Sequence, residues 1–167
     1  RGPSRRPLAA GDAVVVDVTG LADGYVSDQT RTVFLGEPDA RLVSAYETCR
    51  AILDACEQLL VPGTPASALY ERGLEVATEA GLDAHYMGFG RERMRFVGHA
   101  IGLELNEAPA LARGVAMPLV EGAVIAVEPK LLFPGLGAVG VENSYVVRAG
   151  GPERLTLAGD DPIRVEP

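Results

Sequence analysis

The sequence lacks any uninterrupted apolar run long enough to span a bilayer, and no signal-peptide pattern opens it. These absences argue against a membrane helix within the sequence and predict a cytoplasmic location with no membrane partner. The first residue is an arginine, so we expect the true start of the protein to lie upstream. The missing targeting signal therefore carries little weight.

Basic residues are scarce relative to acidic ones, with 15 Lys and Arg against 23 Asp and Glu and a formal net charge of -8. An excess of negative charge argues against non-specific binding to nucleic acid, whose phosphates attract basic surfaces. Part of this excess would disappear if buried acids hold cations. The sequence therefore predicts no nucleic-acid partner.

Cysteine is nearly absent, because Cys49 and Cys56 are the only two and lie seven residues apart in a helical pattern. A helical rise of about 1.5 Å per residue separates their Cα atoms by roughly 10 Å. That separation is too large for a disulfide. We interpret both as residues on a helix face in a reducing compartment, with no role in metal binding.

The stretch VVVDVTGLADGYVSDQTR, from Val14 to Arg31, predicts a β-hairpin, because β-branched runs flank glycine and aspartate turn residues. It carries two acids, Asp17 and Asp28. If the loop centres on Ala22–Asp23 the acids pair directly, and if it centres on Asp23–Gly24 they are diagonal neighbours. Asp17 follows three valines, where an unpaired carboxylate is costly, so we expect a positive group between the acids. Taken alone, such a pair is more often a solvated edge.

Apolar residues make up 47% of the 167 residues, which suits one domain with a sizeable core. Helical spacing of apolar residues from Leu42 to Leu60 predicts a helix that is capped by Asp39 and stops before Pro62. A second helix is expected from Pro65, with Thr64 as its cap, to about residue 80. Two helices after a hairpin predict helices packed on one face of a sheet.

A second hairpin repeats the arrangement of the first. Residues 123–133 form an apolar strand with one acid, Glu128, and residues 138–147 return with another, Glu142. The two acids are equidistant from Gly135 in the turn, so they too can face each other. Four acids embedded in the apolar strands of two hairpins are not the pattern of solvent-exposed acids on an ordinary protein surface.

Two histidines lie between the hairpins. His99 follows Gly98 and precedes a small apolar run, and alone it would more often be a satisfied core residue than a ligand. His85 lies in residues 82–95, which predict a loop with a short strand at 84–87. We interpret His85 as a surface or packing residue, with substrate binding as the alternative. Three arginines of this loop form a solvated run, with contact to a substrate carboxylate as the alternative: Arg91, Arg93 and Arg95. A further loop is expected at 111–117.

Four carboxylates and one imidazole form a hard, mostly oxygen ligand set that suits Mn, Fe, Co or Zn better than a thiophilic ion. One divalent ion would leave this set negative, whereas two would neutralise four carboxylates. Paired ions about 3.5–4 Å apart recur in aminopeptidases and phosphatases, where they generate hydroxide near neutral pH and polarise the attacked carbonyl. The sequence thus predicts two divalent metal ions as cofactors.

The order Asp, Asp, His, Glu, Glu, carried in VVVDVTG, SDQTRT, GHAIGLE, AVEPK and GVENS, resembles the pita-bread metallopeptidases. That family includes methionine aminopeptidase, aminopeptidase P, prolidase and the metal-free creatinase. The run AVEPKLLFPGLGAVGVEN looks most like the Xaa-Pro branch. The resemblance implies an α+β pita-bread fold, in which a curved antiparallel sheet holds the metals and helices lie on its outer face.

The resemblance also assigns roles to the five residues. It implies that Asp28 and Glu142 bridge both metals. Asp17 would complete one metal site, and His99 and Glu128 would complete the other, with Glu128 also catalytic. Because all five ligand types are present, the resemblance argues against the metal-free branch.

Three features depart from the family pattern. The second histidine, which the family places seven residues after the metal-binding one, is replaced by Asn106. Asparagine can donate a hydrogen bond but has no titratable proton at neutral pH. Gly140 stands where the aminopeptidase P branch often has arginine. A further family histidine would fall at or before Arg1, so we expect the sequence to lack the N-terminal portion of the fold and to be a C-terminal part of a longer chain.

The resemblance therefore implies a dinuclear metal-dependent peptidase that hydrolyses the bond before proline, as an Xaa-Pro dipeptidase or Xaa-Pro aminopeptidase. Residues 1–167 would form its catalytic domain, acting on small peptides, with Asn106 in a catalytic position and a homodimer as a compatible assembly. Two alternatives stay open: an aminopeptidase of other specificity, and a non-catalytic binding protein on the same fold. Asn106 is the feature that favours the second alternative.

Overall fold

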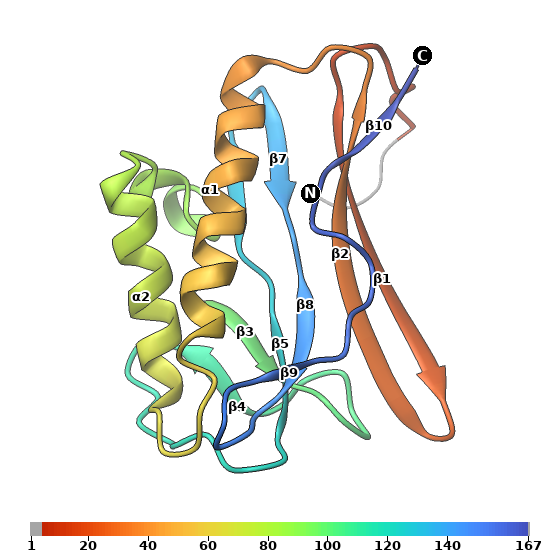
Figure 1. Ribbon diagram of the computed structural model, residues 1–167. Coiled ribbons are helices and arrows are strands. Elements are labelled where there is room, and N and C mark those ends of the chain that lie inside the picture. Colours follow the sequence, from red (N-terminus) through yellow and green to blue (C-terminus); the bar gives the residue numbers. More distant parts are fainter. Residues whose placement is uncertain (1–4, 167) are drawn as a thin grey trace.

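The computed structural model describes residues 5–166, and its first two strands form the long hairpin that the sequence predicts (Figure 1). β1 (Ala13–Ala22) and β2 (Tyr25–Leu35) are antiparallel. Their turn is Asp23–Gly24, and both residues have a positive φ, 50° and 86°. Asp-Gly is favoured in such turns because both positions require this backbone conformation.

The turn fixes the register of the two acids. Asp17 lies opposite Thr30, and Asp28 lies opposite Thr19. The acids are therefore diagonal neighbours, which is the second of the two alternatives that the sequence left open. Side chains two residues apart along a strand share a face, so both carboxylates project from the same side of the hairpin.

The remaining strands build a five-stranded sheet, a two-stranded ribbon and one short addition to β2. The sheet has the order β4-β3-β5-β8-β9, the ribbon pairs β6 with β7, and β10 is parallel to β2. Their bounds are β3 (Phe96–Ala100), β4 (Glu107–Ala112), β5 (Val124–Val127), β6 (Lys130–Phe133), β7 (Gly137–Gly140), β8 (Asn143–Val146), β9 (Glu153–Arg154) and β10 (Ile163–Val165).

Both strands of the predicted second hairpin are interrupted at their acids. Glu128 lies between β5 and β6, and Glu142 lies between β7 and β8. At these breaks the backbone pairs elsewhere: Glu128 N donates to Val97 O at 2.9 Å, and Glu142 N donates to Thr30 O at 3.0 Å. The second bond ties β7–β8 to the first hairpin, so the two hairpins meet at their acidic residues.

Two helices lie side by side on one side of the strands, as the sequence predicts (Figure 1). α1 (Ala40–Glu57) begins after Asp39, whose carboxylate accepts a hydrogen bond from Arg41 N, so the predicted cap is confirmed. α2 (Ala66–Glu79) is capped by Pro65 without a side-chain hydrogen bond, so the prediction of Thr64 as the cap is wrong. Helix α1 contacts β6 and β7, and α2 contacts β3 and β4.

One local prediction is wrong and another is confirmed only in part, because partners distant in sequence decide the backbone. The expected strand at 84–87 is a short 3-10 helix, η1 (Asp83–His85), followed by one isolated bridge from Tyr86 to Leu131. The expected loop at 111–117 is a loop from residue 113 onward, but its first two residues belong to β4, whose pairing with β3 places Ala110 opposite His99. A second short 3-10 helix, η2, spans Gly90–Glu92.

The core lies between the two helices and the strands. Its largest fully buried side chains include Tyr46, Tyr86, Tyr145 and Phe34. Cys49 and Cys56 are buried and free, as their spacing predicts. Within residues 5–166, none of the helices combines the length and apolarity that crossing a bilayer requires.

Candidate metal centre

The five residues singled out from the sequence lie on or beside five different strands. Asp17 is on β1, Asp28 on β2 and His99 on β3, while Glu128 follows β5 and Glu142 precedes β8. All but Asp17 are buried. They form two groups that share Glu142, and each group offers ligand atoms within 4.8 Å of one another. The sequence prediction that these residues gather in one place is confirmed.

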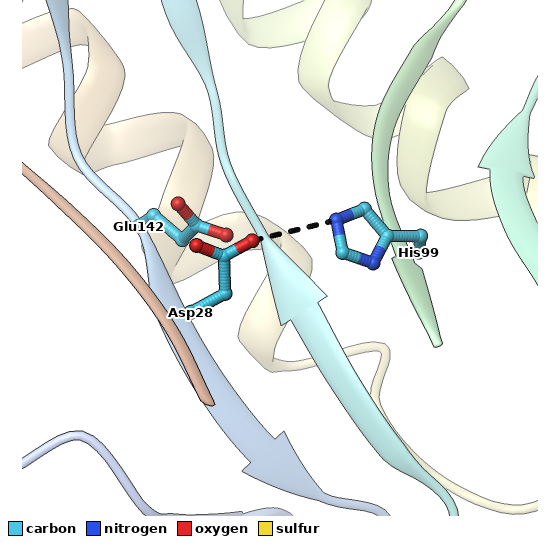
Figure 2. A group of neighbouring side chains, drawn as sticks. All are labelled: Asp28, His99 and Glu142. Carbon is cyan, nitrogen blue, oxygen red and sulfur yellow. Dashed lines mark ion pairs between the residues drawn. The ribbon is translucent and has the colours of Figure 1, made fainter. Parts of the chain in front are cut away.

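The inner group consists of Asp28, His99 and Glu142. Figure 2 shows the carboxylates of Asp28 and Glu142 next to each other, with the ring of His99 pointing at them. The Nε2 atom of His99 lies 3.9 Å from Asp28 Oδ2. Its other nitrogen, Nδ1, lies 3.1 Å from the backbone oxygen of Ala100. Since a carbonyl only accepts, this bond puts the proton on Nδ1 and leaves the Nε2 lone pair free for a cation.

The outer group consists of Asp17, Glu128 and Glu142. Asp17 is 46% exposed, and it lies in the part of β1 from Val16 onward in which every residue is exposed. Its neighbours Val16 and Val18 are exposed as well. The interpretation of Asp17 as an acid buried among valines is therefore wrong for the described residues.

The positive group beside Asp17 is Lys130 at the start of β6, but it lies between Asp17 and Glu128 and not, as expected, between Asp17 and Asp28. Its Nζ is 3.0 Å from Asp17 Oδ2 and 2.7 Å from Glu128 Oε2. Sequence reasoning missed this residue. The available signal was its position two residues after Glu128 in an extended segment, which places the two side chains on one face.

The inner group is short of hydrogen-bond donors. Two of its buried carboxylate oxygens, Asp28 Oδ1 and Glu142 Oε1, have no partner among the described residues. Burial raises the pKa of Glu142 to about 8. Burial, with the nearby charge of Asp17, also raises the pKa of Asp28. Buried polar atoms are almost always paired, so these two oxygens fit a site that takes a cation.

One hydroxyl orients the shared glutamate. Thr30 Oγ1 donates to Glu142 Oε2 at 2.7 Å, and the backbone oxygen of Thr30 accepts from Glu142 N. Thr30 lies in the SDQTRT run but was not singled out from the sequence. These two bonds hold the Glu142 carboxylate with its free oxygen available to a ligand.

The remaining candidates lie elsewhere. His85 is in η1, where its ring stacks on Phe133 at 4.2 Å between centroids and its Nδ1 is 2.8 Å from Leu132 O. Asn106 precedes β4, is exposed, and makes no side-chain hydrogen bond to the described part of the chain. Its catalytic role and the substrate role of His85 stay predictions. Three arginines line a hollow of about 560 Å³ beside Tyr70 on α2: Arg91, Arg93 and Arg95.

The chain is similar to known proteins in sequence and in fold. An Xaa-Pro dipeptidase of Lactobacillus delbrueckii subsp. lactis is 32% identical over 156 residues, which cover 93% of this chain and 40% of that protein. The crystal structure of dipeptidase PepE from Mycobacterium ulcerans is 30% identical, with a TM-score of 0.89, and the match covers 98% of this chain and 42% of that one. X-Pro aminopeptidase from Thermotoga maritima is 26% identical, also with a TM-score of 0.89, over 97% of this chain and 44% of that one.

These comparisons confirm the pita-bread fold and the likeness to the Xaa-Pro branch that the five motifs predict. The chain spans less than half the length of the relatives just described. The sequence model that describes metallopeptidase family M24 matches residues 1–149, a range that contains both groups of acids. On the strength of that match, the chain belongs to metallopeptidase family M24.

Proposed function

We propose that this chain provides the catalytic site of a dinuclear metal-dependent peptidase that cleaves Xaa-Pro bonds, as a dipeptidase or an aminopeptidase. The observation that supports this proposal most directly is the pair of acid groups sharing Glu142. They offer four carboxylates and one imidazole, and two of their buried oxygens have no hydrogen-bond partner among the described residues. Two divalent cations would neutralise such a set, whereas a purely structural cluster would contain its own counter-charges.

The five residues would share the binding of the two ions. Glu142 belongs to both groups, which suits a bridging ligand, and the family resemblance gives Asp28 the same role. The resemblance also places Asp17 at one ion and His99 and Glu128 at the other. Glu128 is within reach of both groups, because its Oε1 lies 3.6 Å from His99 Nε2. Manganese and cobalt are the first ions to test, with iron and zinc as alternatives.

Two divalent ions bound there would supply a water of lowered pKa and polarise the attacked carbonyl. The chain's own residues would prepare that reaction. Thr30 keeps the Glu142 carboxylate in one orientation, and the Nδ1 bond of His99 keeps its Nε2 turned towards the site. Glu128 would accept the proton released by the attacking water, since it is the buried acid beside both groups.

Asn106 would donate a hydrogen bond to the carbonyl oxygen as negative charge develops on it. A donor aimed at developing charge commonly contributes a hundredfold or more in rate, and a neutral amide should contribute less than a histidine. We expect Asn106→Ala to lower kcat by about tenfold and Asn106→His to raise it, with smaller changes in KM. Steady-state kinetics on one Xaa-Pro peptide would test this, and an unchanged kcat for Asn106→Ala would remove Asn106 from the catalytic site.

The substrate class follows from the relatives named above, which are called Xaa-Pro dipeptidase, dipeptidase and X-Pro aminopeptidase. We propose small proline-containing peptides as the substrates, a cytoplasmic location and a homodimer. We propose neither a nucleic-acid partner nor a membrane partner. An aminopeptidase of other specificity is the nearest alternative.

A binding protein without catalysis is the second candidate, and the asparagine at position 106 is the observation that favours it. Such a protein would be expected to have lost some of the metal-binding residues, yet all five are present in this sequence. A protein that binds two ions per chain but cleaves no Xaa-Pro peptide would support this candidate over a peptidase.

The deciding experiment combines metal analysis with hydrolysis assays on the full-length protein. After manganese or cobalt loading, we expect about two ions per chain and cleavage of Xaa-Pro dipeptides or of longer Xaa-Pro peptides. Glu142→Gln should lose both metal binding and peptide cleavage. Asp54→Asn changes an exposed acid on α1 and is the matched control. Absence of bound metal in the wild-type protein would overturn the proposal.

A further inference from the structure

We infer that the hollow beside α2 is a binding site for a small molecule that carries two phosphate groups, and that four arginines hold this molecule. The hollow measures about 560 Å³, and its arginines are Arg91, Arg93, Arg95 and Arg113. They come from η2, from the segment that leads into β3, and from the residue after β4. The site goes beyond the proposed peptidase function, because its lining includes none of the five candidate metal ligands.

The hollow gathers positive charge on an acidic chain. Four of the 15 basic residues of the sequence line it, and none of its described lining residues is an acid. The formal net charge of the chain is -8, so this positive charge is not part of a generally basic surface. Like charges that lie close together repel one another, and an anion bound among them would relieve that repulsion.

The four guanidinium groups are not engaged by acids of the chain. Within residues 5–166, none of the four forms an ion pair. Arginines elsewhere do form such pairs, because Arg72 lies 3.0 Å from Glu75 and Arg148 lies 2.9 Å from Glu153. The donors around the hollow are therefore available to a ligand, and the planar guanidinium group matches phosphate oxygens in a two-pronged contact.

Two of the arginines are held in place by contacts that leave their outer nitrogens available. Arg93 Nε donates to the backbone oxygen of Tyr86 at 2.9 Å. The guanidinium carbon of Arg113 lies 5.9 Å from the ring centroid of Tyr70, within the range of a cation–π contact. A side chain that is already held loses less conformational freedom when a ligand binds.

A glycine gives the segment before β3 the shape that positions Arg93. Gly88 has a φ of 131°. A Cβ atom there would lie 2.7 Å from the Cα atom of Arg93 and 2.9 Å from the backbone oxygen of Glu92, so only glycine allows this close approach. Met94 N donates to Met87 O at 2.8 Å. The segment is thus folded back on itself, which fixes the backbone that carries Arg93.

The number of guanidinium groups favours phosphate over the carboxylate of a peptide. A carboxylate has a single charge and can pair fully with one guanidinium, which would leave the other arginines uncompensated. One phosphate group carries about 1.5 to 2 negative charges at pH 7 and three acceptor oxygens. Two phosphate groups therefore match four arginines in charge and in acceptors.

The size and surroundings of the hollow favour a small ligand over a nucleic acid. Its volume lies within the usual range of small-molecule sites. A long polyanion would also have to approach the rest of a chain whose net charge is -8, and the repulsion would oppose it.

The test is a calorimetric titration of the full-length protein with inorganic pyrophosphate, in about 0.15 M salt so that diffuse attraction is screened. EDTA is present, so that no ion at the metal centre can hold the phosphates. We expect one binding step with a Kd of about 100 μM or tighter, and binding of orthophosphate at least about tenfold weaker.

Two single variants should weaken this step. Arg91 and Arg95 are exposed and make no side-chain hydrogen bond to the described residues, so replacing them should leave the fold intact. Arg91→Gln and Arg95→Gln should each raise the Kd by about fivefold or more, and the double variant by about thirtyfold. Arg95→Lys keeps the charge but loses the planar donors, so its effect should be smaller than that of Arg95→Gln.

The matched control is Arg72→Gln, which removes the same charge from α2 at a residue that does not line the hollow. It should leave the Kd within about twofold. The inference is overturned if pyrophosphate binds more weakly than about 1 mM, or if Arg72→Gln weakens binding as much as Arg95→Gln does. Citrate binding as tightly as pyrophosphate, or a short single-stranded DNA displacing it, would overturn the assignment to a small phosphorylated ligand.

Discussion

Two polar clusters lie on opposite sides of one short segment, because Glu142 and Asn143 are adjacent and point in opposite directions along an extended backbone. Glu142 enters the candidate metal centre. Asn143 enters a second cluster, here called the arginine cluster, which consists of Arg31, Asn143, Arg154 and Asp160. Both clusters contain acids that are at least partly buried, but only the arginine cluster supplies hydrogen-bond donors to all oxygens of its acid.

The arginine cluster is complete in itself. Arg31 donates to the backbone oxygen of Glu142 at 2.7 Å and to Asn143 Oδ1 at 2.9 Å. Arg154 reaches both oxygens of Asp160 at 2.7 Å. Burial would raise the pKa of Asp160, but hydrogen bonds from Arg154 and Asn143 outweigh it and hold that pKa below its usual range.

The metal centre shows the opposite balance. Burial raises the pKa values of Asp28 and Glu142, and one oxygen of each has no hydrogen-bond donor within residues 5–166. In the described part of the chain, the lysine or arginine that pairs with these acids is Lys130 at the outer group, whose pKa the carboxylates raise although burial alone would lower it. The comparison shows that burial of an acid does not by itself identify a binding site. A buried acid whose oxygens lack hydrogen-bond donors does indicate one.

The largest effect should come from removing a shared ligand of the metal centre. Asp28→Ala should abolish binding of both ions if Asp28 bridges them, and should reduce peptidase activity on the order of ten-thousandfold, or about 5 kcal/mol. Elemental analysis and kcat/KM on an Xaa-Pro peptide would measure this. Two ions retained in Asp28→Ala would rule out a bridging role. The same change in the exposed acid Asp54 should alter neither quantity.

The next effect concerns the arginine cluster and should appear in stability rather than in metal content. Arg31→Met leaves the backbone oxygens of Thr30 and Glu142 and the amide oxygen of Asn143 without the buried guanidinium that donates to them, which should lower the free energy of unfolding by about 4 kcal/mol. Urea unfolding of the metal-loaded protein would measure it. Arg164→Met removes an exposed guanidinium that lies 5.7 Å from the Phe34 ring centroid, and should cost much less. A loss no greater than that of Arg164→Met would mean that the cluster is not structural.

A smaller effect distinguishes the two clusters by how the stability of the metal-free protein depends on pH. The pKa of Glu142 rises from 4.5 to about 8 on folding, so the folded state binds more protons than the unfolded state between these values. Stability should therefore fall as pH rises through this window. Glu142→Gln removes the contribution of this residue and should stabilise the metal-free protein by about 2 kcal/mol at pH near 8.5.

Urea unfolding of chelator-treated protein on both sides of the window would check this prediction, with Mn²⁺-loaded wild type as the control. Loading should remove the loss of stability at high pH, because cations favour the charged carboxylates. If Glu142→Gln were less stable than the wild type at high pH without metal, the carboxylate would not be the strained group that its surroundings indicate.

The comparison also separates what the sequence could predict from what it could not. The register of the first hairpin depends on Asp23–Gly24, a local turn signal, and the spacing of Asp17 and Asp28 follows from it. The five candidate ligands lie on strands or directly beside them, and the metal-binding chemistry of each can be recognised from its residue type. The order of the motifs that carry them, and the family resemblance it indicates, predicted that they gather.

Partners that lie far apart in the sequence could not be predicted in this way. Lys130 contacts Asp17 across 113 residues, and Arg31 contacts Asp160 across 129. Neither local sequence predicts the partner residue, because the two contacts depend on how β6 and the segment before β10 pack against the first hairpin. The solvent exposure of Asp17 was misjudged for a related reason: three valines indicate burial only if another layer covers them.

The smallest effect runs in the opposite pH direction and belongs to the arginine cluster. Asp160 has a pKa held below its usual range in the folded state, so it contributes stability above the unfolded pKa and loses it as pH falls through the folded one. Its side chain is 19% exposed, which screens the effect, so Asp160→Asn should cost about 1 kcal/mol at neutral pH. The cost of Asp160→Asn should shrink as the medium becomes acidic. The gain from Glu142→Gln should also shrink as pH falls from the alkaline side, but it has the opposite sign. Urea unfolding across the acid range would measure it, with Asp161→Asn, an 87% exposed neighbour, as the control. A cost for Asp160→Asn that grows on acidification would contradict the assignment of Asp160 as the satisfied counterpart of Glu142.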